Sequence, residues 1–330
     1  MIIARSPLRI SFFGGGTDFP KFYKTNTLGG AVINAAIDKY NYINIRQLDN
    51  YFKHKYRIRY FVNEEINKIK DIKHPIIRLI FKKYLNNKNG YEIVHNSDLP
   101  ARSGLGSSSS FTNALILASL SYQNLNINNN ELWKKSIKIE QSIEKDGVGS
   151  QDQIITALGG VKFINFKSNQ VKVLDLKNYE NIKFFKERCS LFFTGFTRIA
   201  SKIEKDKIKS LKQNYSLYQD ILSICFEAYK NFESEKNINL STMSELFREQ
   251  WKIKKSLSDN VSNKKIDDLY NFGLKNGAVA GKILGAGGGG FFMFLSKDLK
   301  SKKKLIKKIK SISLVNFNFD NDGTKIIYRS

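Results

Sequence analysis

A run of small and hydroxylated residues stands near residue 105, Pro100-Ala-Arg-Ser-Gly-Leu-Gly-Ser-Ser-Ser-Ser110. It lies between a segment that alternates as a strand and an apolar segment typical of a helix. Small residues let the backbone approach a ligand closely, and the free N–H groups of a helix start favour an anion. The serine hydroxyls can bind phosphate oxygens or Mg²⁺. The run therefore predicts a phosphate site, although it lacks the Walker lysine. A flexible loop that caps a helix is the alternative.

A second glycine run, Gly285-Ala-Gly-Gly-Gly-Gly290, satisfies the spacing GxGxxG. A dinucleotide-binding fingerprint needs a strand before it and a helix after it. Here the glycines lead into an apolar segment, Phe291–Leu295, that is typical of a strand, so the dinucleotide interpretation fails. Four consecutive glycines instead indicate close packing against another loop or a nucleotide.

Two glycine-bounded turns each carry an aspartate. Gly147-Val-Gly-Ser-Gln-Asp-Gln153 places Asp152 where it could act as a base or a metal ligand. Phe12-Phe-Gly-Gly-Gly-Thr-Asp18 places Asp18 where it could accept hydrogen bonds from sugar hydroxyls. Taken singly, each motif is explained at least as well by an ordinary turn, so neither defines a site alone.

The spacing of apolar residues predicts a strand-rich first half that would position these loops. Strands are expected at residues 1–13 (two short strands around Pro7), 31–37, 42–47, 91–96, 161–166 and 171–174, the last two as a hairpin. Helices are expected at residues 111–122 and 132–143.

The second half is predicted to be richer in helix. Its expected elements are a strand at 190–194, helices between 199 and 275, a strand at 291–295, a helix at 302–312 and a C-terminal hairpin that turns at 321–323. A strand-rich half followed by a helix-rich half favours an α+β fold. We expect two domains, residues 1–175 and 176–330.

The composition fits a globular enzyme. The 330 residues include 55 basic and 30 acidic ones, a net charge of +25. The lysines are spread along the chain, so nucleic acid is not an expected partner; the charge could instead steer an anionic substrate. The only cysteines, Cys189 and Cys225, form no CxxC pair, so a structural zinc site is not expected.

The sequence also indicates a cytoplasmic protein. Arg5 and Arg9 stand where a secretory leader would need an apolar core. No apolar run reaches the ~18 residues that a membrane helix needs, so no membrane partner is expected. A homodimer is left open by the sequence.

Taken together, the four motifs resemble those of the GHMP kinases. The family motif P-x-x-x-G-L-G-S-S matches Pro100–Ser108 at every fixed position, and the C-terminal glycine motif matches Gly285–Gly290. The first motif, with its G-G-G-T-D form, and the segments GVGSQDQ and FTGFTRIASKI resemble the D-glycero-D-manno-heptose 7-phosphate kinases within that family. Galactokinases carry a glutamate and a histidine in the first motif, which this chain lacks.

The resemblance implies an N-terminal domain like ribosomal protein S5 domain 2, a ferredoxin-like C-terminal domain and an active site between them. It also implies an enzyme that uses ATP and Mg²⁺ to phosphorylate the anomeric hydroxyl of the heptose 7-phosphate for GDP-heptose biosynthesis. The alternatives are a kinase for a free sugar such as fucose and a non-catalytic sugar sensor. A sensor would be expected to have lost the aspartate or the phosphate loop.

The resemblance assigns the catalytic and nucleotide-binding roles. Asp152 matches the aspartate that faces the acceptor hydroxyl, as a base or as an orienting group, and Arg9 matches a basic residue beside it. The implied nucleotide-binding residues are Gly104, Leu105, Gly106, Ser107, Ser108, Ser109, Gly287 and Gly288.

The metal and sugar ligands are implied in the same way. Ser108 and Glu140 match the Mg²⁺ ligands, although Gln141 and Glu144 stand close to Glu140. The implied sugar-binding residues are Gly15, Gly16, Thr17 and Asp18. From the residues themselves, Arg198 is the first candidate for the 7-phosphate, because a guanidinium can hold a phosphate with two parallel hydrogen bonds. Arg102, Lys21 and Lys282 are weaker candidates.

Overall fold

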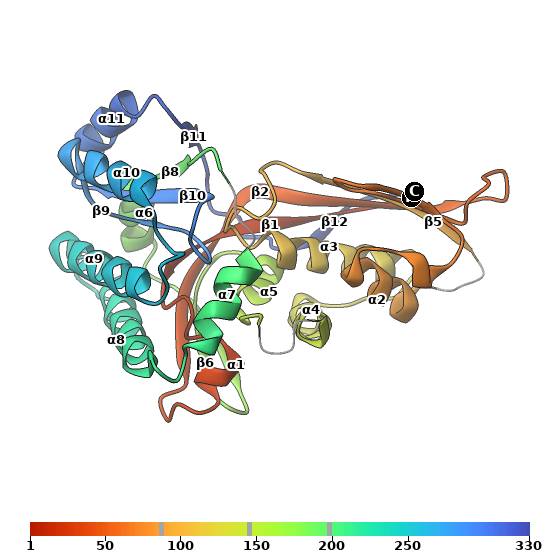
Figure 1. The fold of residues 1–330 in the computed structure, drawn as a ribbon, viewed down its shortest axis with the longest axis horizontal. Helices are drawn as coiled ribbons and strands as arrows, with labels where there is room; N and C mark the ends of the chain where they lie inside the picture. Colours follow the sequence, from red (N-terminus) through yellow and green to blue (C-terminus); the bar gives the residue numbers. More distant parts are fainter. Residues whose placement is uncertain (86–88, 144–146, 197–199) are drawn as a thin grey trace.

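The structure is a computed structural model that describes residues 1–85, 89–143, 147–196 and 200–330. Its first sheet is built around two long strands, β1 (Ile2–Phe13) and β2 (Gly30–Leu48), which pair antiparallel (Figure 1). The strand order is β12-β1-β2-β5-β3-β4. At residues 30–35, β2 pairs with β6, which in turn pairs with β7. The predicted β6–β7 hairpin is thereby confirmed.

The other elements of this part are short and surround one buried helix. The strands are β3 (Tyr56–Arg59), β4 (Asn63–Ile66), β5 (Gly90–Ser97), β6 (Val161–Phe166), β7 (Val171–Asp175) and β12 (Lys325–Arg329). The helices are α1 (Pro20–Tyr23), η1 (Ile69–Asp71), α2 (Pro75–Tyr84), α3 (Ser107–Tyr122), α4 (Asn129–Ile143) and α5 (Gln151–Leu158). α3 packs between the sheet and α2, α4 and α5. Small polar and apolar residues are buried on nearly all of its faces, so the helix is enclosed by the surrounding elements.

The second sheet has the order β11-β8-β10-β9. Its strands are β8 (Cys189–Phe193), β9 (Ala278–Ile283), β10 (Phe291–Ser296) and β11 (Ser313–Val315). The helices are α6 (Tyr179–Arg188), α7 (Ala200–Lys209), α8 (Tyr215–Phe232), α9 (Leu240–Ser256), α10 (Lys264–Lys275) and α11 (Leu299–Lys308). The α+β class predicted from the sequence is confirmed.

One apolar cluster joins the two sheets. It takes Phe12 from β1, Cys225 from α8 and Met293 from β10, all of them buried. α8 lies against both β1 and β2. Because this cluster is shared, the loops at the ends of β1, β5 and β9 are held together at the junction.

Two expected breaks in the first strands do not occur. β1 runs through Pro7 as one strand, and β2 runs through residues 38–41. The register of the pair shifts between Pro7, opposite Tyr40, and Leu8, opposite Ile37. A proline cannot donate to the ladder but is tolerated at such a bulge, so the strand continues past it.

The prediction of a C-terminal hairpin is wrong, although the predicted turn is present. Gly323 has a φ of +71°, and its N–H and that of Asp322 donate to the Asp320 carboxylate. The two arms do not pair with each other. Phe319 bridges to Ile37, and β12 pairs with β1. The division at residue 175 stays a prediction, but this last strand lies in the first sheet.

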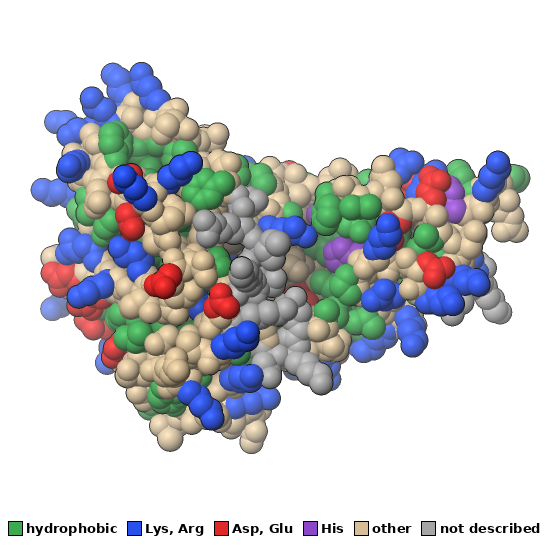
Figure 2. All heavy atoms as spheres, in the orientation of Figure 1, with side chains coloured by type: hydrophobic (Ala, Val, Ile, Leu, Met, Phe, Trp, Pro, Cys, Tyr) green, Lys and Arg blue, Asp and Glu red, His purple; other side chains and the backbone are tan. Residues whose placement is uncertain are grey.

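Basic side chains lie over both parts of the molecule in the view of Figure 2. The lysine-rich helix α11 ends at Lys308, earlier than expected, and β11 follows it. Within the described ranges, no helix is long and apolar enough to cross a membrane.

Candidate active site

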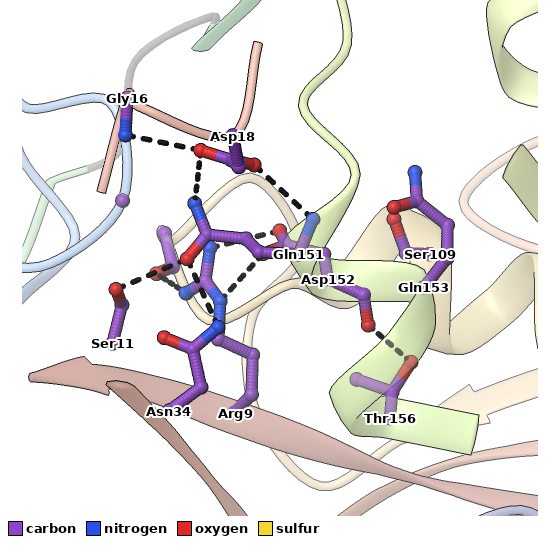
Figure 3. A network of polar contacts seen from close by, with 12 residues as sticks. Arg9, Ser11, Gly16, Asp18, Asn34, Ser109, Gln151, Asp152, Gln153 and Thr156 are labelled. Carbon is purple, nitrogen blue, oxygen red and sulfur yellow. Dashed lines mark hydrogen bonds and ion pairs between the residues drawn. The ribbon is translucent and has the colours of Figure 1, made fainter. Parts of the chain in front are cut away.

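Arg9 and Asp152 form the centre of the site (Figure 3). Arg9 lies on β1 and Asp152 in the first turn of α5. The Arg9 Nε and Nη2 atoms donate to the two carboxylate oxygens at 2.7 and 2.8 Å. The Arg9 side chain is 5% exposed and the Asp152 side chain 24% exposed. The arginine therefore fixes the orientation of the carboxylate. The Asp152 side chain stays partly exposed, so a ligand can reach it.

The same arginine also holds the serine-rich loop. Its Nη1 donates to the carbonyl of Gly104 at 2.5 Å, and its backbone N–H donates to Leu105 at 2.9 Å. Gly106 precedes α3 with a φ of +70°. A Cβ there would lie 2.9 Å from Arg9 Cγ and 3.3 Å from an Asp152 oxygen. Only glycine fits, so the loop and the aspartate are held in direct contact.

The C-terminal glycine run packs against this loop. A Cβ on Gly285 would lie 2.4 Å from Gly104 Cα, and one on Gly290 would lie 2.1 Å from the Ser103 carbonyl. Gly288 contacts another segment, where its N–H donates to Val261. The close packing against another loop that the glycine run indicates thus occurs at Gly285 and Gly290.

Gly287 lies on the same side of the glycine run as Gly288. A Cβ on Gly287 would lie 2.9 Å from the Cα of Val261. The nucleotide-binding roles predicted for Gly287 and Gly288 stay predictions.

Glu140 is buried beside the start of α3. One of its oxygens accepts from Ser109 Oγ at 3.0 Å and from Gln153 Nε2 at 2.7 Å. Its other oxygen is buried without a hydrogen-bond partner in the described structure. Burial raises the pKa of this carboxyl to about 7. Ser109 thus contacts Glu140, whereas Ser108, the predicted metal ligand, is exposed in the same turn.

These groups fit a Mg²⁺ ion. Mg²⁺ prefers oxygen ligands and keeps several waters, so a carboxylate and a hydroxyl are a sufficient protein contribution. The unpartnered Glu140 oxygen is a free ligand of that kind. Its desolvation would be offset by a bound cation.

Asp18 lies on the other side of Asp152 and is 1% exposed. Its carboxylate accepts from the N–H groups of Gly16 and Gln151 and from Gln151 Nε2, at 3.0, 3.1 and 2.9 Å. Burial, and then the charge of Asp152, raises the pKa of Asp18 to about 6. A Cβ on Gly149 would lie 2.1 Å from an Asp18 oxygen, so a larger residue at position 149 would clash with this carboxylate.

The other predicted sugar ligands differ in position. Gly15 is exposed next to Gln151, and Gly16 has a φ of +104° beside the Tyr218 ring. Thr17 does not fit the predicted role. It is fully buried, and its hydroxyl donates to the carbonyls of Gly14 and Ala31. Thr17 therefore shapes the loop.

The predicted phosphate-binding residues that the structure describes have different surroundings. Arg198 lies outside the described residues. Arg102 is exposed, with its guanidinium 5.4 Å from the centre of the Phe61 ring. Lys282 is 4% exposed, and its ammonium donates to the carbonyl of Phe12 at 2.5 Å. Lys282 therefore binds the end of β1 and does not point to a phosphate.

Sequence reasoning missed Ser11, Asn34 and Gln151. Ser11 and Asn34 lie opposite each other on β1 and β2, and both donate to Gln151 Oε1. One signal was available. Residues two apart on a strand share a face, so Ser11 had to point the same way as Arg9.

Comparison with known proteins gives the same assignment from the whole chain. The GHMP kinase N-terminal domain profile matches residues 67–160, and the GHMP kinase C-terminal profile matches residues 228–313. A D-glycero-alpha-D-manno-heptose 7-phosphate kinase of Campylobacter jejuni is 31% identical, over 98% of each chain. The chain belongs to the GHMP kinases. Membership confirms the kinase activity and the fold implied by the motifs.

Two further relatives of this GHMP kinase are informative. A bifunctional fucokinase/GDP-fucose pyrophosphorylase of Arabidopsis thaliana is 26% identical over 92% of this chain, but the match covers 30% of that protein. The crystal structure of a D-glycero-D-manno-heptose 1-phosphate kinase from Bacteroides thetaiotaomicron matches all of both chains with a TM-score of 0.78. At 19% identity, that likeness shows the shared fold.

Proposed function

We propose that this GHMP kinase transfers the γ-phosphoryl group of ATP to the C1 hydroxyl of D-glycero-D-manno-heptose 7-phosphate. The products would be the 1,7-bisphosphate and ADP. The observation that carries the chemistry is the Asp152 carboxylate, held by Arg9 directly against Gly106 of the serine-rich loop. The choice of sugar is supported by the named activity of the Campylobacter jejuni relative.

The proposed reaction needs little covalent help from the protein. The C1 oxygen bonds to the γ-phosphorus while the bond from that phosphorus to the β–γ bridging oxygen breaks, and ADP leaves. Catalysis of this kind is mostly positioning and charge stabilisation. The loop N–H groups would bind the phosphates, and Asp152 would accept the hydroxyl proton or orient the hydroxyl. Arg9 would hold the carboxylate in its orientation.

Glu140 would hold Mg²⁺ with a serine of the α3 start. When bound, the ion would neutralise charge on the phosphate oxygens. Ser109 already contacts Glu140, and the first turn also offers the exposed Ser108. The metal role predicted for Ser108 stays part of this proposal.

The test is ADP release by the purified protein with Mg²⁺-ATP and a panel of acceptors. The panel holds the heptose 7-phosphate, the heptose 1-phosphate, free heptose, fucose, galactose and mevalonate. We expect turnover on the heptose 7-phosphate well above all others. Turnover on fucose or free heptose alone would overturn the sugar-phosphate assignment, and turnover on the 1-phosphate would overturn the position of transfer. No turnover on any member would favour the sugar sensor.

A further inference from the structure

The Gln151 side chain makes three hydrogen bonds next to the proposed acceptor position, and no motif assigned it a role. It precedes Asp152 at the start of α5, and both residues are half-buried. Gln151 Oε1 accepts from Ser11 Oγ at 3.1 Å and from Asn34 Nδ2 at 3.0 Å. Its Nε2 donates to Asp18 Oδ1 at 2.9 Å, and Figure 3 shows the amide between these groups.

These partners fix the direction of the amide. The Asp18 carboxylate can only accept when ionised, so the group that faces it must be the Gln151 nitrogen. The Gln151 oxygen then faces Ser11 and Asn34, and both of these side chains can donate to it. A flipped amide would set an oxygen against the carboxylate. The glutamine therefore has one low-energy orientation.

The backbone of the same residue makes a second contact with Asp18. The Gln151 N–H donates to Asp18 Oδ2 at 3.1 Å, so side chain and main chain together bind both oxygens. One strand thus anchors two adjacent residues of α5. Ser11 contacts Gln151, and Arg9 contacts Asp152 at both carboxylate oxygens.

We propose that Gln151 is a positioning residue that ties Asp18 to the first turn of α5 and thereby sets the direction in which Asp152 presents its carboxylate to the acceptor. This inference rests on the proposed function for the identity of the acceptor. We assign Gln151 an action through the two aspartates because its oxygen and one of its two amide N–H groups are already bound by protein partners.

The charged surroundings of Asp18 give this proposal a measurable signature. Among the described residues, the titratable groups that face Asp18 are Asp152 on α5, Tyr23 on α1 and Tyr218 on α8. The pKa of Asp18 is already raised to about 6, by burial first and by Asp152 second. Loss of the Gln151 donor, or a negative charge in its place, should raise this pKa further.

The experiment compares Gln151→Glu and Gln151→Leu with the wild type and with Gln170→Glu, a control that adds the same charge on the exposed β6–β7 turn. The pKa of Asp18 is read by carboxyl NMR on protein labelled at aspartate, with Asp18→Asn to assign the signal. We expect the pKa to rise by about one unit or more in both Gln151 variants and to stay unchanged in the control.

The kinetic arm uses the acceptor that the wild type phosphorylates. We expect kcat/KM for this acceptor to fall about tenfold to a hundredfold at neutral pH, with its acid limb moved to higher pH and the KM for ATP unchanged. Ser11→Ala removes one hydrogen bond to the Gln151 amide oxygen. It should raise the Asp18 pKa and lower kcat/KM for the acceptor, in each case by less than the Gln151 variants do.

The outcomes separate the two proposals. An unchanged Asp18 pKa in folded Gln151 variants overturns the role of Gln151, whatever the substrate. Equal losses toward ATP and acceptor with an unmoved acid limb overturn it too, because they indicate a general structural defect. A raised Asp18 pKa in the Gln151 variants, together with no phosphorylation of any heptose by the wild type, would support the role of Gln151 and reject the proposed substrate.

Discussion

The side-chain amide of Gln250 accepts a hydrogen bond from the backbone N–H of Gly14 at 2.7 Å. The same amide donates to the carbonyl of Phe12 at 2.9 Å. The Gln250 side chain thus makes the pair of hydrogen bonds that the backbone of a neighbouring strand would make. Gln250 lies on α9, in the second half of the chain, and is buried. The second half therefore holds the end of β1 just before the loop that carries Asp18.

Replacing Gln250 by leucine should destabilise the protein by about 1–3 kcal/mol, the cost of a buried group left without a partner. Gly14 would lose its acceptor, whereas the carbonyl of Phe12 would keep the ammonium of Lys282. The measurement is urea unfolding, with the exposed Gln170→Leu as control. An unchanged midpoint in Gln250→Leu would show that this contact carries no stability.

Gly285→Ala should separate the two glycine-containing loops. The added Cβ would lie 2.4 Å from Gly104 Cα, and neither backbone can yield without moving the loop. A shift of about 1 Å can cost a hundredfold, so we expect the KM for ATP to rise about tenfold to a hundredfold.

Gly195→Ala is the matched control for this change. Gly195 has a φ of +84°, close to the +66° of Gly285, but a Cβ there meets nothing within 4 Å. Both variants therefore carry similar backbone strain, and only one carries the clash. Equal effects of the two on the KM for ATP would rule out the contact between the loops as the cause.

Asp152→Asn should lower kcat about 10²- to 10⁴-fold, the usual contribution of a group that accepts or orients a proton. The amide still has one oxygen for Arg9, so the loop should keep its place and ATP should still bind. Isothermal titration with a non-hydrolysable ATP analogue checks the binding, and ADP release checks the rate. A rate within a few-fold of the wild type would remove Asp152 from the chemistry.

Lys282 should make the folded protein sensitive to pH above neutrality. Burial lowers the pKa of its ammonium from the usual 10.5 to about 7. Between these two pKa values the unfolded chain binds a proton that the folded chain does not, so this lysine's contribution to stability rises with pH from about 7 to 10.5 and is lost as pH falls.

Lys282→Met should reduce this slope by up to about 1.4 kcal/mol per pH unit, the value for one proton. The measurement is the free energy of unfolding in urea at several pH values between 7 and 10. Lys303→Met, an exposed position on α11, provides the control. Parallel slopes for the wild type and Lys282→Met would contradict the lowered pKa.

The sequence predicted the loops of the site better than the contacts between them. The serine run, the glycine run and the two aspartates each carry a local pattern, and the structure brings Arg9, Asp152 and Gly106 together. The hydrogen bond between Gln151 and Asp18 joins residues 133 positions apart. No local pattern specifies such a pair, because it depends on how β1 meets α5.

The errors in the fold have a similar origin. Pro7 normally ends a strand, but a bulge opposite it lets β1 continue. The turn at Gly323 is correctly placed by its residue types, yet its arms pair with Ile37 and β1. Turn chemistry is local and can be read from the sequence, whereas the choice of strand partner is decided by the whole sheet.

The position of phosphoryl transfer is the most direct test of the proposed function. Wild-type protein is incubated with Mg²⁺-ATP and D-glycero-D-manno-heptose 7-phosphate, and the product is examined by ³¹P and ¹³C NMR. We predict a second phosphate whose phosphorus couples to the anomeric C1 carbon, and no such product with Asp152→Asn. A new phosphate on any other carbon, or an unchanged heptose 7-phosphate beside a free sugar that is phosphorylated, would contradict the proposal.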